Sequence, residues 1–300
     1  MNPKAARTDP EVVRSVCAVL EREGCEVEVA GTTRANDAGE IAARGVSDGA
    51  EVVAVYGGDG TTMQAVRALV GRPGVALGLV PGGTGNLLAG NLRVPRSPAK
   101  AAQVIARSAR RRIDLGRLER ADGVHYFAVA CGAGFDAELM ASTPGESKRR
   151  WKMGAYVARA VETLGAIQSV PHRVTIDGQV HEFDAASILI ANCGEVIPSV
   201  LTLGSQIAPD DGLLDVVALN ARGFVDALGV VWHLVSGGDA VDERVRYARG
   251  RRITVETAST RPVQADGEAT GQTPFSVGVL PGALEVLVPE EHNSPRVPSP

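Results

Sequence analysis

The chain has 300 residues, of which 44% are hydrophobic and 22% charged, a balance typical of a globular protein with one large domain or two of ordinary size. Its formal net charge of −4 argues against a dedicated nucleic-acid-binding protein, which usually carries a basic excess. Aromatic residues make up only 4% of the chain, which also argues against a surface that stacks single-stranded bases.

The first hundred residues alternate between helical and strand patterns. Asp9 is placed to cap a helix that ends at Gly24, and Ser97 is placed to cap a second helix that runs to about 109. Three short strands are predicted between these helices, two of them apolar runs that end in glycine-rich turns: 25–29, 51–56 and 75–80. Short apolar runs that end in glycine-rich turns are typical of buried parallel strands, so the sequence predicts an α/β domain with a parallel sheet.

Beyond residue 113 short strands predominate, and Asp-Gly or similar turns separate most of them, as in antiparallel hairpins. Helical patterns at 150–166 and 222–235 interrupt these strands, and the aperiodic tail 290–300 is expected to be disordered. This half is therefore predicted to be a mainly antiparallel β-domain. Its predicted strands are 113–118, 125–131, 173–177, 186–191, 214–219, 252–256, 261–265 and 284–288.

Cysteine and histidine spacing argues against a zinc site or a disulfide framework. The four cysteines form no CxxC pair and the five histidines are scattered, so a cytoplasmic location is expected. The longest apolar stretch, 224–235, is shorter than the roughly 20 residues that cross a bilayer. Any membrane contact is therefore expected to be peripheral.

Two glycine-rich turns follow successive predicted parallel strands. Gly57-Gly58-Asp59-Gly60-Thr61 precedes a helix predicted at 62–70, and Pro81-Gly82-Gly83-Thr84-Gly85-Asn86 repeats the arrangement. Glycines let the backbone approach a phosphate closely, and a helix start directs N–H groups at it. A carboxylate in such a turn suits Mg²⁺ held against phosphate, whereas an ordinary βα turn needs fewer glycines. Both turns are expected at one crevice at the carboxyl ends of the strands.

Three other motifs carry weaker signals. Gly132 to Ala137 fits the GxGxxA dinucleotide pattern but lies in the β-rich half, where that role is not expected. Asp266-Gly267-Glu268 has the spacing of a plain hairpin turn. The basic cluster 148–152 contains a tryptophan, so it suits either a solvated helix start or an anionic membrane surface.

In combination, these motifs resemble the diacylglycerol kinase catalytic-domain family, specifically the soluble bacterial lipid kinases related to sphingosine kinases. The resemblance runs from Asn2 to about Pro289. GGDGT alone is shared with NAD kinases, but its combination with the later acidic motifs is specific to the lipid kinases. The segments that carry it are 2–4 (NPK), 57–61 (GGDGT), 81–86 (PGGTGN), 114–116 (DLG), 210–215 (DDGLLD), 266–268 (DGE) and 280–284 (LPGAL).

The resemblance implies a nucleotide-binding α/β domain at 1–112 and a β-sandwich at 113–289, with the site in the cleft between them. It implies ATP and Mg²⁺ at the first domain, Glu268 as general base with Asp266 beside it, and Asp59 as a further catalytic group. A structural Mg²⁺ site would use Asp211 and the carbonyls of Leu213 and Ala208. The implied nucleotide-binding residues are Asn2, Pro3, Thr33, Gly57, Gly58, Asp59, Gly60, Thr61, Thr62, Gly83, Thr84, Gly85 and Asn86.

The chemistry implied is transfer of phosphate from ATP to a lipid hydroxyl. The lipid could be diacylglycerol, a sphingoid base, ceramide or phosphatidylglycerol. The expected partner is this lipid at a membrane surface, with no nucleic acid and with a homodimer left open. Two rival functions are a kinase of a soluble substrate such as NAD, against which the acidic motifs argue, and a nucleotide-binding regulator without turnover.

Two departures from the family pattern bear on these expectations. Many relatives have aspartate where this chain has Leu87, so the contribution of that acid is missing or comes from elsewhere. The family's first strand lies before the Asn-Pro pair, whereas only Met1 precedes Asn2 here. An unpaired neighbouring strand would be costly, so the natural protein is expected to begin several residues upstream, and an extended form is expected to be more stable.

Overall fold

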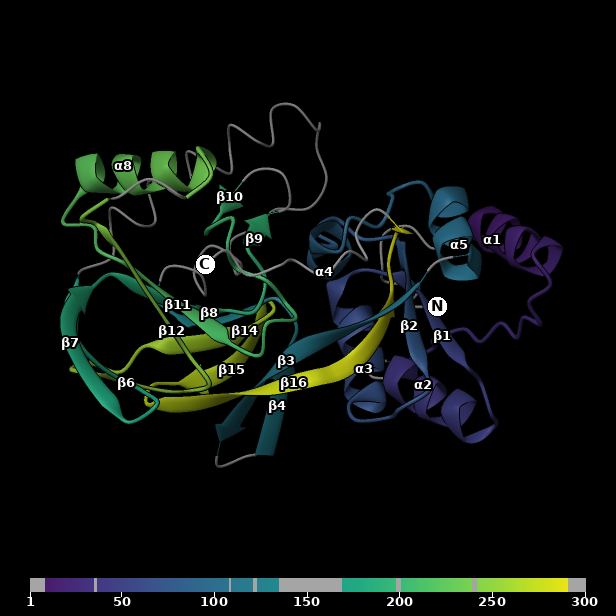
Figure 1. The fold of residues 1–300 in the computed structure, drawn as a ribbon, viewed down its shortest axis with the longest axis horizontal. Coiled ribbons are helices and arrows are strands. Elements are labelled where there is room, and N and C mark those ends of the chain that lie inside the picture. The colour runs from purple at the N-terminus through teal and green to yellow at the C-terminus, as the bar shows by residue number, and fades with distance from the viewer. Residues whose placement is uncertain are drawn as a thin grey trace. The chain divides into compact units, whose positions relative to one another are not determined.

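A computed structural model describes residues 9–34, 37–107, 109–120, 123–134, 169–197, 201–238 and 242–290 (Figure 1). The chain divides into two compact units, one formed by Met1–Ile113 with Gly282–Pro300 and the other by Asp114–Pro281. Asn2, Pro3, the basic cluster 148–152, the helix predicted at 150–166 and all but the first residue of the tail 290–300 lie outside the described residues.

The first unit has the predicted parallel strands with helices around them. Strands β1 and β2 are paired in parallel, with Val52 opposite Ala76 and Gly57 opposite Pro81. Since both strands end at the same level, the glycine-rich turns that follow them start at the same edge of the sheet. The elements are α1 (Pro10–Arg22), α2 (Asp37–Ser47), β1 (Val52–Gly57), α3 (Asp59–Leu69), β2 (Ala76–Pro81), α4 (Leu87–Asn91) and α5 (Pro98–Arg107).

The first helix begins and ends where the sequence predicts. The Asp9 side chain accepts a hydrogen bond from the backbone N–H of Glu11 at 2.8 Å, and proline occupies the first turn. Gly24 has a φ of +86°, the left-handed conformation that closes a helix with least strain on glycine. Local signals suffice here because the cap and the groups it satisfies lie within a few residues of one another.

The strand predicted at 25–29 is wrong. These residues form no strand in the structure, and most of their side chains are exposed. In the described residues β1 pairs with β2 alone, so no neighbouring strand uses the N–H and C=O groups of this segment. Alternation of apolar and polar residues gives a strand only where a partner supplies hydrogen bonds.

The second unit is an antiparallel sandwich. One of its sheets has the order β12-β11-β8-β5-β14-β15 and the other contains the neighbouring strands β16-β13-β6-β7 with the pair β3-β4. Small strands β9 (Glu195–Ile197) and β10 (Leu201–Thr202) form a separate pair. The remaining strands are β3 (Arg110–Arg120), β4 (Gly123–Phe127), β5 (Ala130–Ala133), β6 (Val170–Ile176), β7 (Gln179–Ala185), β8 (Ser187–Ala191), β11 (Leu214–Leu219), β12 (Val245–Gly250), β13 (Arg252–Thr257), β14 (Pro262–Ala265), β15 (Glu268–Gln272) and β16 (Phe275–Leu287).

The strand β11 is buried on both faces, which explains its unbroken apolar sequence. Leu214 and Val216 belong to the core that also contains Ile253 and Val255 of β13. The alternate residues of β11 face the helix α8 (Phe224–Val235), which lies along this sheet (Figure 1). No helix in the described parts of the chain is long and apolar enough to cross a membrane.

The last part of β16 belongs to the first unit. Glu285 and Val286 pair in parallel with Ala76 and Leu77 of β2, so the end of the chain supplies that strand's second neighbour. The predicted boundary near residue 112 lies beside the observed one, which follows Ile113. The predicted second domain, 113–289, extends too far, because the structure places the residues from Gly282 on in the first unit.

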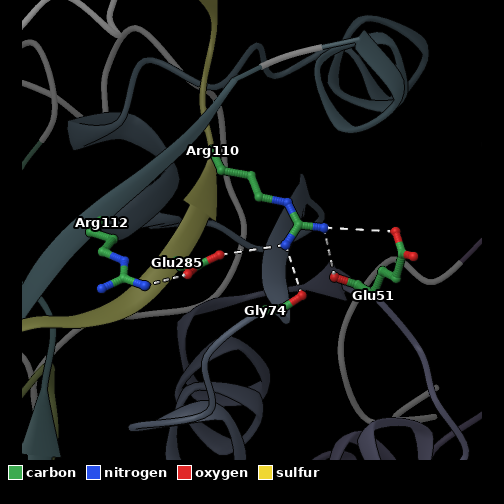
Figure 2. A network of polar contacts seen from close by, with 5 residues as sticks. All are labelled: Glu51, Gly74, Arg110, Arg112 and Glu285. Atoms are coloured by element: carbon green, nitrogen blue, oxygen red, sulfur yellow. Dashed lines mark hydrogen bonds and ion pairs between the residues drawn. The ribbon is translucent and has the colours of Figure 1, made fainter.

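Ion pairs hold this returning strand. Arg110 of β3 forms ion pairs with Glu285 at 3.4 Å and Glu51 at 3.9 Å, and donates a hydrogen bond to the Gly74 carbonyl at 2.7 Å. Arg112 contacts the other oxygen of Glu285 at 3.0 Å (Figure 2). Glu285 is thus shared by two arginines from a neighbouring strand, which fixes the end of β16 within the first unit.

Candidate active site

The turn after β1 presents the start of helix α3 without a side-chain cap. Gly58 is the N-cap residue in extended conformation, and as glycine it supplies no side-chain cap. Its carbonyl accepts the N–H of Thr62 at 3.0 Å, the first hydrogen bond of the helix. The preceding N–H groups at a helix start have no partner within the helix, and the helix dipole favours an anion there. Gly60 and Thr61 lie in this first turn, as a phosphate site requires.

The second glycine-rich turn packs directly against the first. The Gly82 N–H donates to the Gly57 carbonyl at 2.9 Å, continuing the parallel ladder into the turns. A Cβ atom on Gly83 would lie 2.5 Å from the Cα of Gly58, and one on Gly82 would lie 2.7 Å from the Tyr56 ring. The two turns meet through backbone atoms, which only glycine allows.

A Gly83→Ala substitution is expected to separate the two turns, because the added methyl would overlap backbone that has little freedom to move. Overpacking of this kind costs about 1–3 kcal/mol of unfolding free energy, which urea titration would measure. Nucleotide affinity, measured by calorimetry, should fall with it. Gly45→Ala in α2 is the matched control, because its nearest neighbour would be 3.9 Å away. Equal behaviour of the two variants would contradict the close packing of the turns.

Asn86 closes the second turn upon itself. Its side-chain oxygen accepts the Gly83 N–H at 2.9 Å, and its amide nitrogen donates to the Gly83 carbonyl at 2.7 Å. Its φ of 52° is left-handed, a conformation that asparagine tolerates better than most residues. These bonds fix the course of the loop from Gly83 to Asn86, including Thr84 and Gly85.

Asp59 joins the two turns through its carboxylate. Oδ2 accepts the N–H of Asn86 at 2.8 Å and Oδ1 accepts the N–H of Leu87 at 2.6 Å. Burial raises the pKa of this carboxyl above its ordinary value, against the opposing effect of those two hydrogen bonds. A Cβ on Gly85 would lie 2.6 Å from Oδ2, so glycine leaves room for the carboxylate. The structure thus brings together Asp59 and the predicted Gly83–Asn86 loop.

These residues suit a metal that arrives with a nucleotide rather than a preformed metal cage. Among the described residues no group of three or more His, Cys, Asp or Glu side chains could hold a metal ion. Mg²⁺ usually keeps several waters and takes one or two carboxylates together with substrate phosphates. Asp59 is one such carboxylate, and its remaining lone pairs can meet a hydrated cation.

Thr33 lies shortly before α2 and is bonded to Asp37, the first residue of that helix. Its N–H and hydroxyl donate to the Asp37 carboxylate at 2.7 and 2.9 Å, and the Arg34 N–H adds a third bond. These hydrogen bonds lower the pKa of Asp37 to about 2. The adjacent Thr32 was not predicted, yet its buried hydroxyl has no hydrogen-bond partner in the described part of the chain.

The Asp266-Gly267 pair forms a tight hairpin turn between β14 and β15. Both residues have positive φ, 46° and 84°, and Ala265 pairs with Glu268 on either side, the geometry of a two-residue type I′ turn. Glu268 is the first residue of β15 and is half-buried. A hairpin turn at Asp266-Gly267 is therefore compatible with a catalytic role for Glu268, because the turn places Glu268 at the first position of its strand.

Asp266 anchors this hairpin to the rest of the unit. Its carboxylate accepts three backbone N–H groups, from Ala128 at 2.6 Å and from Val129 and Ala130 at 2.9 Å each. Charged acceptors of this kind form strong hydrogen bonds. Asp266 was predicted as catalytic, and in the structure these bonds make it a positioning residue for the turn that carries Glu268.

The predicted structural Mg²⁺ site contains an arginine that sequence reasoning missed. Asp211 Oδ1 accepts the Leu213 N–H at 3.0 Å, while Arg249 lies 3.9 Å from its other oxygen and 3.0 Å from Asp215. Burial raises the pKa of both carboxyls. Asp215 is buried, and its second oxygen has no partner in the described residues. Ala208 is also buried beside this motif, and the ligand set stays a prediction.

The remaining motifs have structural positions. The Asp114 carboxylate accepts the Gly212 N–H at 2.7 Å, which links the DLG and DDGLLD segments. Gly132 lies within β5 between antiparallel β8 and β14, and a Cβ there would be 2.8 Å from the Ile188 carbonyl. Close strand packing accounts for that glycine. Residues 135–137 of the GxGxxA pattern lie outside the described residues.

Two family descriptions match nearly the whole chain. Residues 1–118 match the diacylglycerol kinase catalytic domain, and residues 129–288 match the YegS C-terminal NAD kinase beta sandwich-like domain. A solved structure described as a diacylglycerol kinase from Bacillus anthracis str. Sterne has a similar fold. It is 21% identical, covers 96% of this chain and 94% of its own, and superposes with a TM-score of 0.76.

Curated relatives support the same grouping. A protein of Xanthomonas campestris pv. campestris named "Probable lipid kinase YegS-like" is 32% identical, covering 94% of this chain and 93% of its own. A "Diacylglycerol kinase" of Mycobacterium tuberculosis is 29% identical, covering 91% and 88%. An uncharacterized Synechocystis protein is 28% identical over 82% of this chain, which spans 57% of that protein's length. The chain therefore belongs to the diacylglycerol kinase catalytic-domain family, among its YegS-like lipid kinases.

Proposed function

We propose that the protein is an ATP-dependent lipid kinase that transfers the γ-phosphoryl group of Mg²⁺-ATP to a lipid hydroxyl. The observation that carries this proposal is the pair of glycine-rich turns at the ends of β1 and β2, locked together by Asp59. Two glycine-rich turns at one edge of a parallel sheet, the first at the start of α3 without a side-chain cap from its N-cap residue, offer backbone N–H groups, the chemistry that binds a polyphosphate.

In this proposal the first unit holds the nucleotide. Backbone N–H groups of Gly60 and Thr61, and those of Thr84 and Gly85 in the second turn, would contact phosphate oxygens. Asn86 and Asp59 accept the N–H groups of Gly83 and Asn86 and so fix the loop's course. A bound Mg²⁺ would supply positive charge that neutralises the phosphates and the developing charge on the transferred group. Asp59 would hold the hydrated cation with its remaining lone pairs and would also fix the second turn, so it would serve both binding and reaction.

Glu268 is proposed as the proton acceptor. An alcohol is a poor nucleophile at neutral pH, so a carboxylate must take its proton as the new P–O bond forms and the bond to ADP breaks. The Asp266 anchor restricts the hairpin and holds Glu268 at a defined position. Precise placement of the base is worth a large part of the rate in reactions of this type.

The proposal is tested by product analysis with labelled ATP. Protein incubated with Mg²⁺, ATP and a total lipid extract should yield a labelled phospholipid, with diacylglycerol, a sphingoid base, ceramide and phosphatidylglycerol then supplied singly. NAD is the matched soluble acceptor, because the second family description mentions NAD kinase. Label in NADP with none in lipid would overturn the lipid assignment, and ATP binding with no labelled product from any acceptor would favour a regulator.

A structural Mg²⁺ site at Asp211 makes a separate prediction. A metal that binds folded but not unfolded protein raises the melting temperature by mass action. Mg²⁺ should therefore raise the melting temperature of the wild type, measured against EDTA, and should raise that of Asp211→Ala much less. Equal shifts would show that the acidic group around Arg249 holds no Mg²⁺ and that the arginine alone balances its charge.

A further inference from the structure

Helix α8 is apolar on its inward and its outward face, which is unusual for a helix at the surface of a domain. Its inward side chains pack on the sheet formed by β11, β8 and β12, in one core with Leu201 and Val217. The buried apolar residues of this inward face are Ala227, Val230, Val231 and Leu234; the helix also buries His233, whose ring lies 3.0 Å from the Tyr247 hydroxyl.

The outward face carries a stripe of large apolar side chains. Phe224, Leu228 and Trp232 recur at intervals of four residues, and Val225 and Val235 lie beside them, so all five share one side of the helix. Val225 is 78% exposed and Trp232 is 71% exposed. These five residues, the α8 stripe, are the majority of the large hydrophobic side chains that are exposed in the described parts of the chain; the others are Val29, Val124 and Val180.

Arginines flank the α8 stripe. The Arg244 side chain lies across the helix at Gly229, where a Cβ atom would overlap the guanidinium, and Asp242 holds it with two hydrogen bonds of 2.8 and 2.7 Å. Arg222 precedes the N-cap residue Gly223; its side chain is largely exposed and lies 3.9 Å from the Asp184 carboxylate. An aromatic and aliphatic stripe bordered by arginines is the composition of helices that lie at a lipid headgroup boundary.

We propose that the α8 stripe docks on the surface of a phospholipid bilayer, with the helix lying in the plane of the membrane. Twelve residues of helix are about 18 Å long, short of the roughly 30 Å hydrocarbon core, so α8 would be embedded on one side only. This inference rests on the proposed function, because a kinase whose acceptor is a lipid must reach the bilayer in which that lipid lies.

A second copy of the chain fits the α8 stripe less well than a bilayer does. A stable interface between proteins buries about 800 Å² on each partner, from about 20–30 residues. Five side chains on three turns of helix fall well short of that, and no complementary apolar strip of similar size stands elsewhere in the described residues. A bilayer requires no matched surface, only apolar side chains that can enter it and cations at their edge.

Flotation with vesicles tests the docking surface without turnover. Vesicles of phosphatidylcholine with phosphatidylglycerol would be mixed with wild type, with L228E/W232E, and with the control V124E/V180E, whose valines are 43% and 47% exposed in the same unit. Burial of two large apolar side chains in lipid contributes to the free energy of membrane binding. Their replacement by glutamate should therefore lower the partition coefficient at least about tenfold. The control variant should float like the wild type.

A second measurement uses the native tryptophan and does not depend on how the glutamate variant folds. The chain has two tryptophans, so Trp151→Phe leaves Trp232 as the sole indole. Vesicles should shift its emission to shorter wavelength, and brominated lipid should quench it. Wild type that fails to float, flotation that survives L228E/W232E, or an unshifted Trp232 would each overturn the inference.

Two further outcomes separate this inference from the proposed function. Protein that floats through α8 yet phosphorylates no lipid would retain the docking surface and lose the kinase assignment. Protein that phosphorylates a detergent-dispersed lipid but shows no α8-dependent flotation would retain the kinase assignment and lose the docking surface. Glutamates that convert a dimer into a monomer, seen by light scattering, without changing flotation would assign the stripe to a second copy instead.

Discussion

Glu268→Gln should lower the rate of phosphoryl transfer about 10²–10⁴-fold, because glutamine keeps the size of the side chain but cannot accept the proton of the attacking hydroxyl. ATP affinity should stay within twofold of wild type, since Glu268 lies in the second unit and the nucleotide site in the first. Single-turnover kinetics would isolate the chemical step, and calorimetry would measure nucleotide binding.

The matched control is Glu243→Gln, an exposed acid of the same unit. Asp266→Asn adds a useful comparison, because it perturbs three anchoring hydrogen bonds while leaving Glu268 intact. It should lower both the melting temperature and the rate, whereas Glu268→Gln should lower the rate alone. Near wild-type turnover in Glu268→Gln would remove Glu268 as the base.

Asp59→Asn should damage both nucleotide binding and turnover. An amide can accept one of the two N–H groups from Asn86 and Leu87 but presents a donor to the other, so the second turn loses part of its attachment. Loss of a hydrogen bond to a charged group costs about 1.5–3 kcal/mol, part of it returned because the neutral side chain is easier to bury. Affinity for Mg²⁺-ATP should fall at least about tenfold, the equivalent of 1.4 kcal/mol.

Calorimetry with and without Mg²⁺ is the measurement for Asp59. Asp48→Asn, an exposed acid in the same unit, is the control and should bind ATP normally. If Asp59→Asn retains the ATP affinity and the Mg²⁺ dependence of the wild type, the carboxylate has only a structural role, which is to connect the two turns. A fall in affinity that is equal with and without Mg²⁺ would assign the effect to the loop and leave the metal role unsupported.

Features that depend on neighbours in sequence were predicted well. The cap of α1, the strands β1 and β2, and the glycine-rich turns follow from patterns a few residues long. The prediction of a mainly antiparallel second domain is also confirmed, although 125–131 divides into β4 and β5. The strands β7 and β12 were missed because few of their side chains are fully buried, so neither strand has a clear apolar alternation.

Features that depend on distant partners could not be predicted. Asp266 has the sequence of a turn residue, and its role as an anchor depends on N–H groups more than 130 residues earlier. Arg249 and Asp215 are likewise brought together only by the register of β11 and β12. The resemblance to a family named residues at the site, but it gave no indication that Asp59 binds the second turn or that Asp266 accepts three backbone N–H groups.

The return of β16 to the first unit has a consequence for folding during synthesis. Strand β2 carries the second glycine-rich turn, yet one of its two neighbours is formed by Glu285 and Val286, which are synthesised long after β2 and after the whole of the second unit. Until then one edge of that strand lacks partners for its backbone groups. A nascent chain stalled between residues 120 and 280 should therefore bind ATP poorly, and the competence to bind nucleotide should arise only as the last strand is released.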